Sequence, residues 1–488
     1  MTSFLSKNHK LLLPAMMLLS LIMHSHILNT DLIGIHVWRQ TQTQTVIDNF
    51  AAEDFNILNP KINDHAHTDR IMRMEFPIMQ WVFAIFYKAF GQQIIISRLL
   101  TLLLGFCSVL GMYRLCYTLF NNRKIGVLAA WTFSFSPVFY YYTANPLPDN
   151  LAMCCAIWSF VFYFQYFNDR KVKHIIFSGL MLMMATMAKL PFVLYGLVDV
   201  VFLIAYFRKD IKLAFTPALV YGLFLIPPAV WYINVIPTWH GNGVVKGIFD
   251  TSTYASSEVL NIITGTLSSM LPELLLNYGS TLFFLAGLFF FFKKKLYRSK
   301  YYLSIFIVFI SVCLYYLYEV NMITLVHDYY MFPFLPFLFV LVAYGAYKLL
   351  NGRNKILKAI SILALIILPI TAFLRVDSRW NTTEPGFNHV YYDHKDELRA
   401  LVNEDAYCVV GNDISHYILL YYLNRKGWTF DSDYLNEYDL KFFISKGAKY
   451  LFTDSPVDEN PNIKPFLNEK IYEQENLRVY TLQMSEHI

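Results

Sequence analysis

Charged residues are scarce in this sequence. They make up only 15% of its 488 residues, whereas about 25% is usual for a soluble domain. Hydrophobic residues reach 56% and aromatic residues 17%. This balance excludes an ordinary cytosolic enzyme, and it also excludes a disordered or fibrous chain. A bilayer explains the apolar excess, because about 20 apolar residues span its hydrocarbon core and several such stretches recur along the chain.

Cysteine is also sparse, and its six copies form no metal-binding or disulfide pattern. Five lie in or beside apolar runs, and Cys408 alone lies in the polar C-terminal region. No pair has the CxxC spacing of a metal site, so we expect small apolar fillers and predict no metal ligands. A small-residue cleavage site is missing after the first apolar run, 11–28. We therefore interpret this run as an uncleaved first membrane helix.

The apolar stretches predict about eleven membrane spans. They are expected at 11–28, 93–119, 124–143, 150–168, 174–188, 190–207, 213–236, 278–292, 301–319, 329–350 and 355–374. The apolar, aromatic stretch 76–90 is too short to span comfortably and predicts an interfacial or re-entrant helix. The long polar stretch 29–76 before it predicts the first external loop.

Basic residues predict the orientation of these spans. The loops near Arg123, Arg170, Arg208, Arg298 and Arg353 are all basic. The alternate loops hold most of the acidic and histidine residues that precede the C-terminal domain, and they lie at 29–76, 144–149, 189–191, 237–277 and 320–328. Because basic loops face the cytoplasm, we expect a cytoplasmic N-terminus, a periplasmic or external C-terminus and a bacterial inner (plasma) membrane location.

The composition changes abruptly after the last span. Residues 376–488 carry frequent charges and no 18-residue apolar run. We expect strands at 406–412, 450–453 and 478–483 and helices at 414–426 and 434–448, which together predict a small α/β domain. The predicted fold is thus a polytopic α-helical membrane domain over 1–375 and an external α/β domain over 376–488. The residues GND (411–413) end a predicted strand, where they mark either a ligand site or a simple Gly-Asn turn.

Ionisable residues gather at the predicted external boundary of the membrane. Such residues are costly at membrane depth and are functional candidates. The set comprises Asp31, His36, Arg39, Arg70, Arg73, Glu75, Asp149, Lys189, His327 and Asp328. Each residue also has a structural interpretation, for example a helix cap for Asp149, a snorkelling side chain for Lys189 and an ion pair between Glu75 and Arg73.

A face of this kind suits transfer from a lipid-linked phosphate. Its cations can hold a phosphate at headgroup level, and its carboxylates can accept a proton from a hydroxyl. Aromatic residues can stack on a sugar or line a groove for a lipid tail. The sequence contains no Walker A motif, so energy would come from the lipid–phosphate bond itself.

The order of several short motifs resembles the GT-C class of membrane glycosyltransferases. More narrowly, it is similar to the branch that holds protein O-mannosyltransferases and the aminoarabinose transferase of lipid A. The motifs are IHVWRQTQT (35–43), FNILNP (55–60), RMEFPIMQW (73–81), ANPLPDNLA (144–152), AKLPFVL (188–194), HDYYMFPFLP (327–336) before Gly345, and GAKYLFTD (447–454). The resemblance implies an inverting transfer from a polyprenyl-phosphate sugar at an external cavity.

The resemblance also implies where the site residues lie. The class usually has an acidic pair after the first span and a basic residue near the interfacial helix. Here His36 and Val37 stand near the place of the acidic pair, and Phe76 stands where the basic residue is often found. The catalytic role is therefore open among Asp31, His36, Glu75 and Asp149. The candidates for holding the donor phosphate are Arg39, Arg73, Lys189, His327 and Tyr329.

Two functions follow from these observations. The first is a hexosyl- or pentosyltransferase that uses a polyprenyl-phosphate sugar as co-substrate and acts on an envelope lipid, glycan or protein. Its partners would be the lipid-linked donor, membrane lipids and that acceptor, with no nucleic acid; no cofactor is assigned, and a divalent metal is left open. The second is a non-catalytic relative or a transporter of a lipid-linked sugar. A transporter would place charges through the middle of the membrane, whereas here they gather at one face, which favours the enzyme.

Overall fold

The computed structural model describes residues 9–65, 69–239, 255–320, 327–431 and 434–484. The chain divides into two compact units. The first, here called the helical unit, comprises Met1–Asn29, Met74–Met79 and Ser97–Asp377. The second, the mixed unit, comprises Thr30–Arg73, Gln80–Ile96 and Ser378–Ile488. The structure thus groups the polar stretch after the first span with the C-terminal residues.

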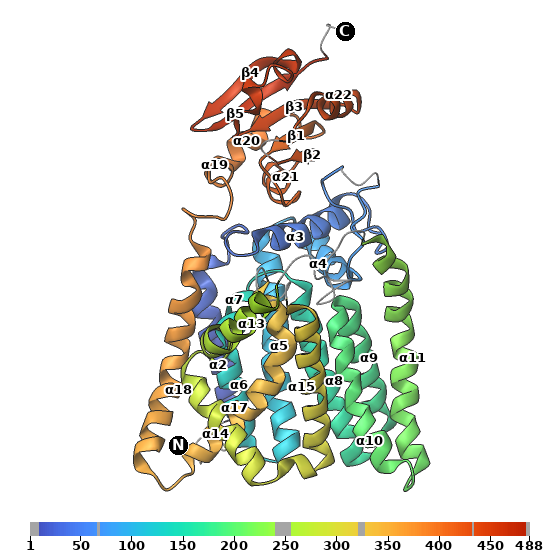
Figure 1. The fold of residues 1–488 in the computed structure, drawn as a ribbon, viewed down its shortest axis with the longest axis vertical. Coiled ribbons are helices and arrows are strands. Elements are labelled where there is room, and N and C mark those ends of the chain that lie inside the picture. The colour runs from blue at the N-terminus through green and yellow to red at the C-terminus, as the bar shows by residue number, and fades with distance from the viewer. Residues whose placement is uncertain (1–8, 66–68, 240–254, 321–326, 432–433, 485–488) are drawn as a thin grey trace. The chain divides into compact units, whose positions relative to one another are not determined.

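The helical unit consists almost entirely of apolar helices (Figure 1). Its principal helices are α2 (His9–His24), α5 (Ile94–Phe120), α6 (Arg123–Ser134), α7 (Pro137–Tyr142), α8 (Pro148–Asp169), α9 (Val172–Ala188), α10 (Val198–Tyr206), α11 (Ile211–Val235), α13 (Ser256–Gly265), α14 (Gly279–Lys293), α15 (Lys300–Tyr318), α17 (Leu335–Leu350) and α18 (Lys355–Val376). Helices α8, α9 and α11 lie side by side, and α9 packs on both of its neighbours.

Each predicted span coincides with helix, which confirms a multi-pass helical membrane protein. Seven helices among the described residues are long and apolar enough to cross a membrane, or eight if one bent pair forms a single span. The remaining predicted spans are shorter or broken. The span expected at 124–143, for example, is divided between α6 and α7 before Pro137, where the ring of proline prevents helix continuation. The number eleven stays a prediction.

Part of one region expected to be a loop is helical, although residues 240–254 of that region lie outside the described residues. Within 237–277, helix α13 leads into η5 (Thr266–Leu275), which is a π-helix. This helical stretch meets α14 at a bend of 111°. Asn277 and Tyr278 make the bend with positive φ values of 48° and 45°. The prediction of a loop is wrong for 256–275, because that stretch is only half apolar and lacks the continuous run by which the spans were found.

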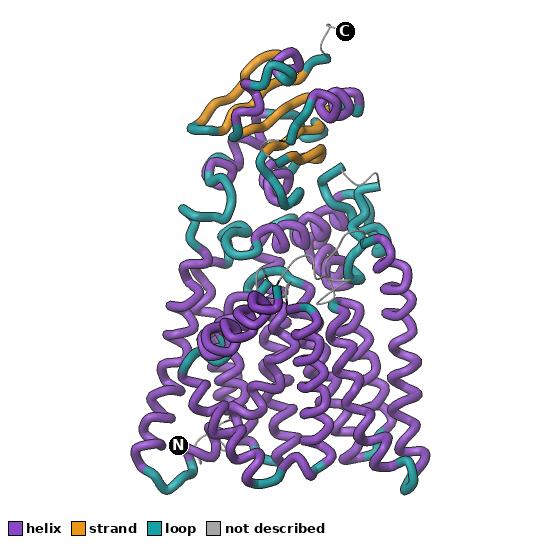
Figure 2. Tube along the Cα trace, in the orientation of Figure 1, coloured by secondary structure: helices purple, strands orange, loops and turns teal. Residues whose placement is uncertain are grey.

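The mixed unit contains all five named strands of the described residues, drawn in orange in Figure 2. These are β1 (Tyr407–Gly411), β2 (Lys426–Phe430), β3 (Ala448–Thr453), β4 (Leu467–Gln474) and β5 (Leu477–Leu482), in the order β2-β1-β3-β5-β4. Strand β1 is parallel to β2 and β3, whereas β5 is antiparallel to β3 and β4. Helices α21 (Ile418–Leu423) and α22 (Glu437–Ser445) complete the predicted α/β fold. Strands β2 and β4 were not predicted, and the helix expected over 414–426 is shorter.

The polar stretch after the first span folds as part of the mixed unit. Its helix α3 (Val37–Ala52) places Val37 in the same apolar core as Val390 and Leu419. Further along, the backbone N–H of His65 donates to the carbonyl of Gly427 at 2.7 Å, beside the edge strand β2. The sequence did not reveal α3, since its glutamines and threonines lack an apolar period. The short helix expected at 76–90 is present as α4 (Ile78–Phe90), immediately after Pro77.

Candidate functional site

A buried ion pair joins two residues of the helical unit that are 40 positions apart in the sequence. The Nζ of Lys189 lies 3.4 Å from Oδ1 of Asp149, and the two side chains are 12% and 2% exposed. The ammonium group also lies over two rings, 4.4 Å from the centroid of Tyr330 and 5.3 Å from that of Tyr329. These four residues form what we call the Asp149–Lys189 cluster. Lys189 is therefore held inside the protein and does not extend outward as a snorkelling lysine would.

The backbone on both sides of Asp149 is held rigidly. Pro148 and Asp149 occupy the first turn of α8. Proline is well tolerated at this position, and the positive end of the helix dipole stabilises the carboxylate of Asp149. Before it, the fully buried Arg98 donates to the carbonyl of Ala144 at 2.9 Å and to Oδ1 of Asn145 at 3.0 Å. Asn150 closes the turn by donating to the carbonyl of Tyr142 at 2.9 Å. The carboxylate is thus fixed in place before any substrate binds.

Lys189 and Glu75 belong to neighbouring backbone segments. Lys189 is the C-cap of α9, and its N–H donates to the carbonyl of Ala185 at 2.9 Å. Two residues earlier, the carbonyl of Met187 accepts from the backbone N–H of Phe76 at 3.0 Å. The indole of Trp231 donates to the carbonyl of Met74 at 2.9 Å, so both sides of Glu75 are anchored. Glu75 itself is buried.

His327, Asp328 and Tyr329 lie at the start of the helix that precedes α17. The segment η7 (Asp328–Phe334) stacks Tyr329 on Tyr330 with ring centroids 5.0 Å apart. The ring of His327 lies 5.3 Å from that of Tyr329. Asp328 accepts a hydrogen bond from the hydroxyl of Tyr142. The structure therefore places these predicted residues around the rings that cover Lys189.

Glu319 belongs to the same region, although the sequence analysis did not select it. It is the C-cap of α15, is only 3% exposed, and its Oε2 has no hydrogen-bond partner among the described residues. Tyr315, one turn earlier, lies within electrostatic range of Glu319, Tyr330 and Asp149. The position of Glu319 at the end of the predicted span 301–319 is the signal that would have marked it.

The mixed unit holds the other predicted site residues, and Asp31 is the most constrained of them. Its carboxylate lies 2.8 Å from Nζ of Lys395 and accepts from the hydroxyl of Tyr421 at 2.6 Å. Burial opposes ionisation of Asp31, but Lys395, Tyr421 and the N–H of Leu32 outweigh it and hold the pKa of Asp31 below its ordinary value. A carboxylate stabilised in this way is a weak proton acceptor.

Arg39, His36 and Arg73 occupy three different environments in the mixed unit. Arg39 is buried on α3 and donates to Oε1 of Gln42. His36 is the N-cap of α3 with a positive φ of 59°. Arg73 is half-exposed and forms an ion pair with Asp69.

The described residues offer no ready metal site. Among residues 9–65, 69–239, 255–320, 327–431 and 434–484, no group of three or more His, Cys, Asp or Glu side chains is arranged to hold a metal ion. Asp413, after the predicted Gly-Asn turn, accepts hydrogen bonds from Ser415 and from the backbone N–H of Leu419 at 2.8 Å. Asp413 thereby supports the turn that leads into α21.

Comparison with known proteins gives one family match and several structural matches. The family described as dolichyl-phosphate-mannose-protein mannosyltransferase matches residues 74–232, a range that contains Glu75, Asp149 and Lys189. A search of curated proteins found no match.

The structural matches extend over nearly the whole chain. ArnT from Cupriavidus metallidurans, solved with bound undecaprenyl phosphate, is 11% identical, with a TM-score of 0.63 over 96% of this chain and 97% of its own. The oligosaccharyltransferase AglB from Archaeoglobus fulgidus, in complex with an inhibitory peptide and a dolichol-phosphate, is 12% identical, with a TM-score of 0.60 over 91% and 69% of the two chains. The mycobacterial arabinofuranosyltransferase AftD is 13% identical, with a TM-score of 0.57 over 97% and 42%.

These matches confirm the resemblance drawn from the sequence and support a glycosyltransferase. The chain has the fold of the GT-C membrane glycosyltransferases, and its residues 74–232 match the protein mannosyltransferase family.

Proposed function

We propose that this protein transfers a sugar from a polyprenyl-phosphate donor to an acceptor of the cell envelope, on the external face of the membrane. The observation that carries the proposal is the Asp149–Lys189 cluster, a buried cation and carboxylate beneath two stacked tyrosines. Undecaprenyl phosphate bound to ArnT, whose fold this chain shares, supports a lipid-phosphate donor.

Lys189 is the proposed contact for the donor phosphate. Taking a charge out of water is expensive unless it is paired, and Asp149 provides that pairing while no donor is bound. An ammonium group has three N–H donors, so a phosphate oxygen can bind Lys189 beside Asp149. Tyr329 and Tyr330 each combine an apolar ring with a polar hydroxyl. The rings can contact the lipid tail of the donor, and the hydroxyls can contact its phosphate.

The proposed reaction needs one proton acceptor. The acceptor hydroxyl forms a bond to the anomeric carbon of the sugar, while the bond from that carbon to the phosphate oxygen breaks. The phosphate leaves with the electron pair, and the hydroxyl proton passes to a carboxylate. Glu319 and Glu75 are the two buried carboxylates of the helical unit proposed for this role, since Asp149 is paired with Lys189. Of the two, Glu319 has a buried oxygen, Oε2, without a hydrogen-bond partner among the described residues, which leaves that oxygen available to accept a proton.

The experiment is a transfer assay with the purified full-length protein and radiolabelled polyprenyl-phosphate sugars, with extracted envelope material as the acceptor. We expect Lys189→Met to weaken donor binding about 10- to 100-fold, because a hydrogen bond to a charged group contributes about 1.5–3 kcal/mol. Lys189→Arg should retain part of the binding, since the charge remains but the compact ammonium geometry does not. Mass spectrometry of the product identifies the sugar.

A double variant separates folding from chemistry. Lys189→Met alone leaves Asp149 buried without its cation, which destabilises the fold. The double variant Lys189→Met with Asp149→Asn removes both charges and should restore folded protein without restoring transfer. Asp199→Asn is the matched control, because Asp199 is also a buried carboxylate of the helical unit and accepts from the hydroxyl of Tyr163 at 2.7 Å. Normal transfer by the folded double variant would rule out the cluster as the donor site.

A further inference from the structure

The helical unit also contains a pocket that does not include the Asp149–Lys189 cluster. It has a volume of about 480 Å³ and is lined by α13, η5 and Arg375, which is near the end of α18. Its lining residues do not include Asp149, Lys189, Glu319 or the tyrosines of η7. The pocket therefore needs an explanation of its own.

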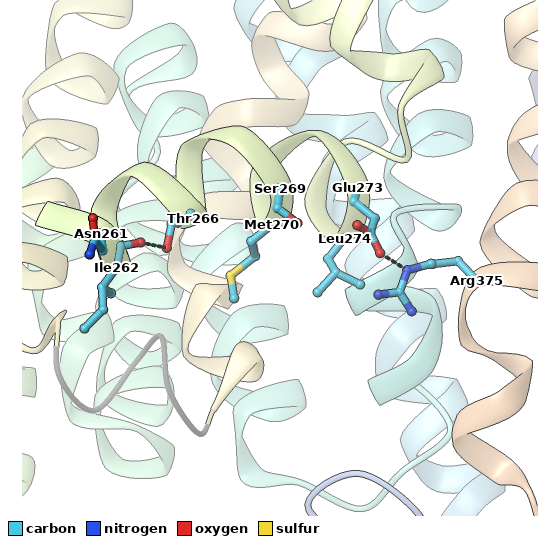
Figure 3. Close-up of a pocket in the computed structure, with 9 residues that line it drawn as sticks. Asn261, Ile262, Thr266, Ser269, Met270, Glu273, Leu274 and Arg375 are labelled. Carbon is cyan, nitrogen blue, oxygen red and sulfur yellow. Dashed lines mark hydrogen bonds and ion pairs between the residues drawn. The ribbon is translucent and has the colours of Figure 1, made fainter. Parts of the chain in front are cut away.

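The pocket has one charged end and an apolar middle (Figure 3). At the charged end, Nε of Arg375 donates to Oε1 of Glu273. The side chains of Met270 and Leu274 lie between this pair and Asn261 at the opposite end. An amphipathic ligand matches such a lining, with its polar group at Arg375 and its apolar part along Met270.

Arg375 uses only part of its hydrogen-bonding capacity in the ion pair with Glu273. Its guanidinium has five N–H groups, and the ion pair with Glu273 uses the Nε position. Among the described residues, its terminal nitrogens Nη1 and Nη2 have no hydrogen-bond partner. The side chain is 38% exposed, and that of Glu273 is 20% exposed. The terminal nitrogens can thus bind a phosphate without breaking the pair. The carboxylate of Glu273, which also interacts with the hydroxyl of Tyr278, is the group of the pocket that can contact a cation.

The surroundings of Arg375 are those of a membrane surface. Arg375 stands at the end of a 26-residue apolar span, Lys355–Trp380. Along α18, the side chains of Ile367, Ile370 and Leu374 are exposed, as expected for a face that contacts lipid tails. The length of the span places Arg375 at headgroup level. The ligand available there in quantity is a phospholipid.

We infer that this pocket binds the headgroup of an aminophospholipid, with its phosphate on Arg375 and its ammonium group on Glu273. The pair is neutral overall, so a zwitterionic headgroup finds both of its charges matched. A purely anionic headgroup would place its charge beside Glu273 and gain less. The π-helical turns of η5 accord with this role, since such turns are rare and frequently occur at functional sites.

Gly265 provides a way to fill the pocket without disturbing the fold. It lines the pocket on the same helical face as Asn261 and Ser269, four residues away on either side. A Cβ built at Gly265 meets no atom within 4 Å. Gly222 on α11 is equally open and lies outside the pocket. Gly265→Leu and Gly222→Leu therefore add the same side chain to a helix, with and without blocking the pocket.

The experiment is native mass spectrometry of the full chain in detergent, titrated with phosphatidylethanolamine or phosphatidylglycerol. We expect wild type and Gly222→Leu to prefer phosphatidylethanolamine, and Gly265→Leu to lose this binding. Arg375→Gln should weaken it at least about tenfold, because charge-assisted hydrogen bonds to phosphate are lost. Glu273→Gln should abolish the preference over phosphatidylglycerol while lipid binding continues.

Four results would overturn the inference. Equal affinity of wild type for the two lipids would show that the ammonium group is not recognised. Unchanged phosphatidylethanolamine binding in both Gly265→Leu and Arg375→Gln would place the lipid elsewhere. Competition by soluble glycerophosphoethanolamine at equal concentration would show that no lipid tail is needed. Displacement by polyprenyl phosphate that depends on Arg375 would make this the donor's pocket. Since the readout is binding, failure of the proposed transferase activity would leave it intact.

Discussion

Glu319 is a buried carboxylate at the end of α15. Its ionised form can accept a proton from the acceptor hydroxyl, whereas its protonated form cannot. If Glu319 is the base, transfer should rise as the pH increases through the range in which Glu319 ionises. Glu319→Gln should lower the rate by about 10²–10⁴ and remove this rise, as measured by initial rates over a pH series.

The control for this profile is Glu469→Gln, which alters an exposed carboxylate on β4 and should leave both rate and pH dependence unchanged. A wild-type rate and profile in folded Glu319→Gln would exclude Glu319 as the base. Glu75→Gln, measured in the same series, then becomes the deciding variant, because Glu75 is the other buried carboxylate proposed for the role.

Ionisation of Asp48 on α3 destabilises the folded state, whereas ionisation of Asp31 stabilises it. Burial raises the pKa of Asp48 to about 7, although Gln44 donates to it at 2.9 Å. In the unfolded chain an aspartate ionises near pH 4. The folded state is therefore disfavoured increasingly as the pH rises from about 4 to about 7. Asp48→Asn should raise the melting temperature at pH 8 and change it little at pH 4, as measured by thermal unfolding of the detergent-solubilised protein.

Asp31→Asn serves as the opposing variant. The pKa of Asp31 is lowered in the folded state by Lys395 and Tyr421 despite burial, so its ionised form stabilises the fold above pH 4 and this contribution is lost at lower pH. We expect Asp31→Asn to lower the melting temperature at pH 8. Equal shifts of the same sign in the two variants would show that neither carboxylate titrates as its surroundings indicate.

At the scale of elements, two glycines allow α14 and α17 to pack closely. A Cβ at Gly345 would overlap the backbone carbonyl of Phe283, and one at Gly287 would overlap that of Leu341. Small residues permit such approach between membrane helices, where packing supplies much of the association energy. Gly345→Leu should therefore lose most folded protein, because backbone cannot yield as a flexible side chain does. Fluorescence-detected size-exclusion chromatography measures the loss.

Gly222→Ala on α11 is the matched control for this prediction. Its added Cβ meets no atom within 4 Å, and alanine is about 1 kcal/mol more favourable than glycine in a helix interior. This variant should fold at least as well as wild type. A normal yield and melting temperature for Gly345→Leu would mean that α14 and α17 are not held in this close packing.

At the scale of the whole molecule, the charge pattern predicts one orientation in the membrane. Loops rich in basic residues, such as Lys293–Lys295 with Arg298, should face the cytoplasm. Alkaline phosphatase is active only outside the cytoplasm, so a fusion after Ile488 should be active and one at Arg298 inactive. The reverse pattern would place the C-terminal residues in the cytoplasm and would contradict transfer on the external face.

Much of the architecture could be predicted from the sequence because it depends on local composition. A membrane span needs only a long apolar run, so a helix lies at each predicted position. Strands β1, β3 and β5 were recognisable from their apolar residues. Strand β4 was not, because it lies at the sheet edge and much of it is exposed and charged. Helix α3 was missed because its buried face is polar.

The sequence identified residues of the candidate site, whereas only the tertiary structure showed how they are arranged. The sequence marked Asp149 and Lys189 as costly ionisable residues at a membrane boundary, a property of each residue by itself. Only the packing of α8 against α9 brings the two charges within 3.4 Å. Other tertiary contacts decided that Asp31 is paired with Lys395 in the mixed unit and that Oε2 of Glu319, at the end of α15, is buried without a hydrogen-bond partner among the described residues. Pairing and desolvation depend on distances between residues far apart in the chain, which composition and local pattern do not encode.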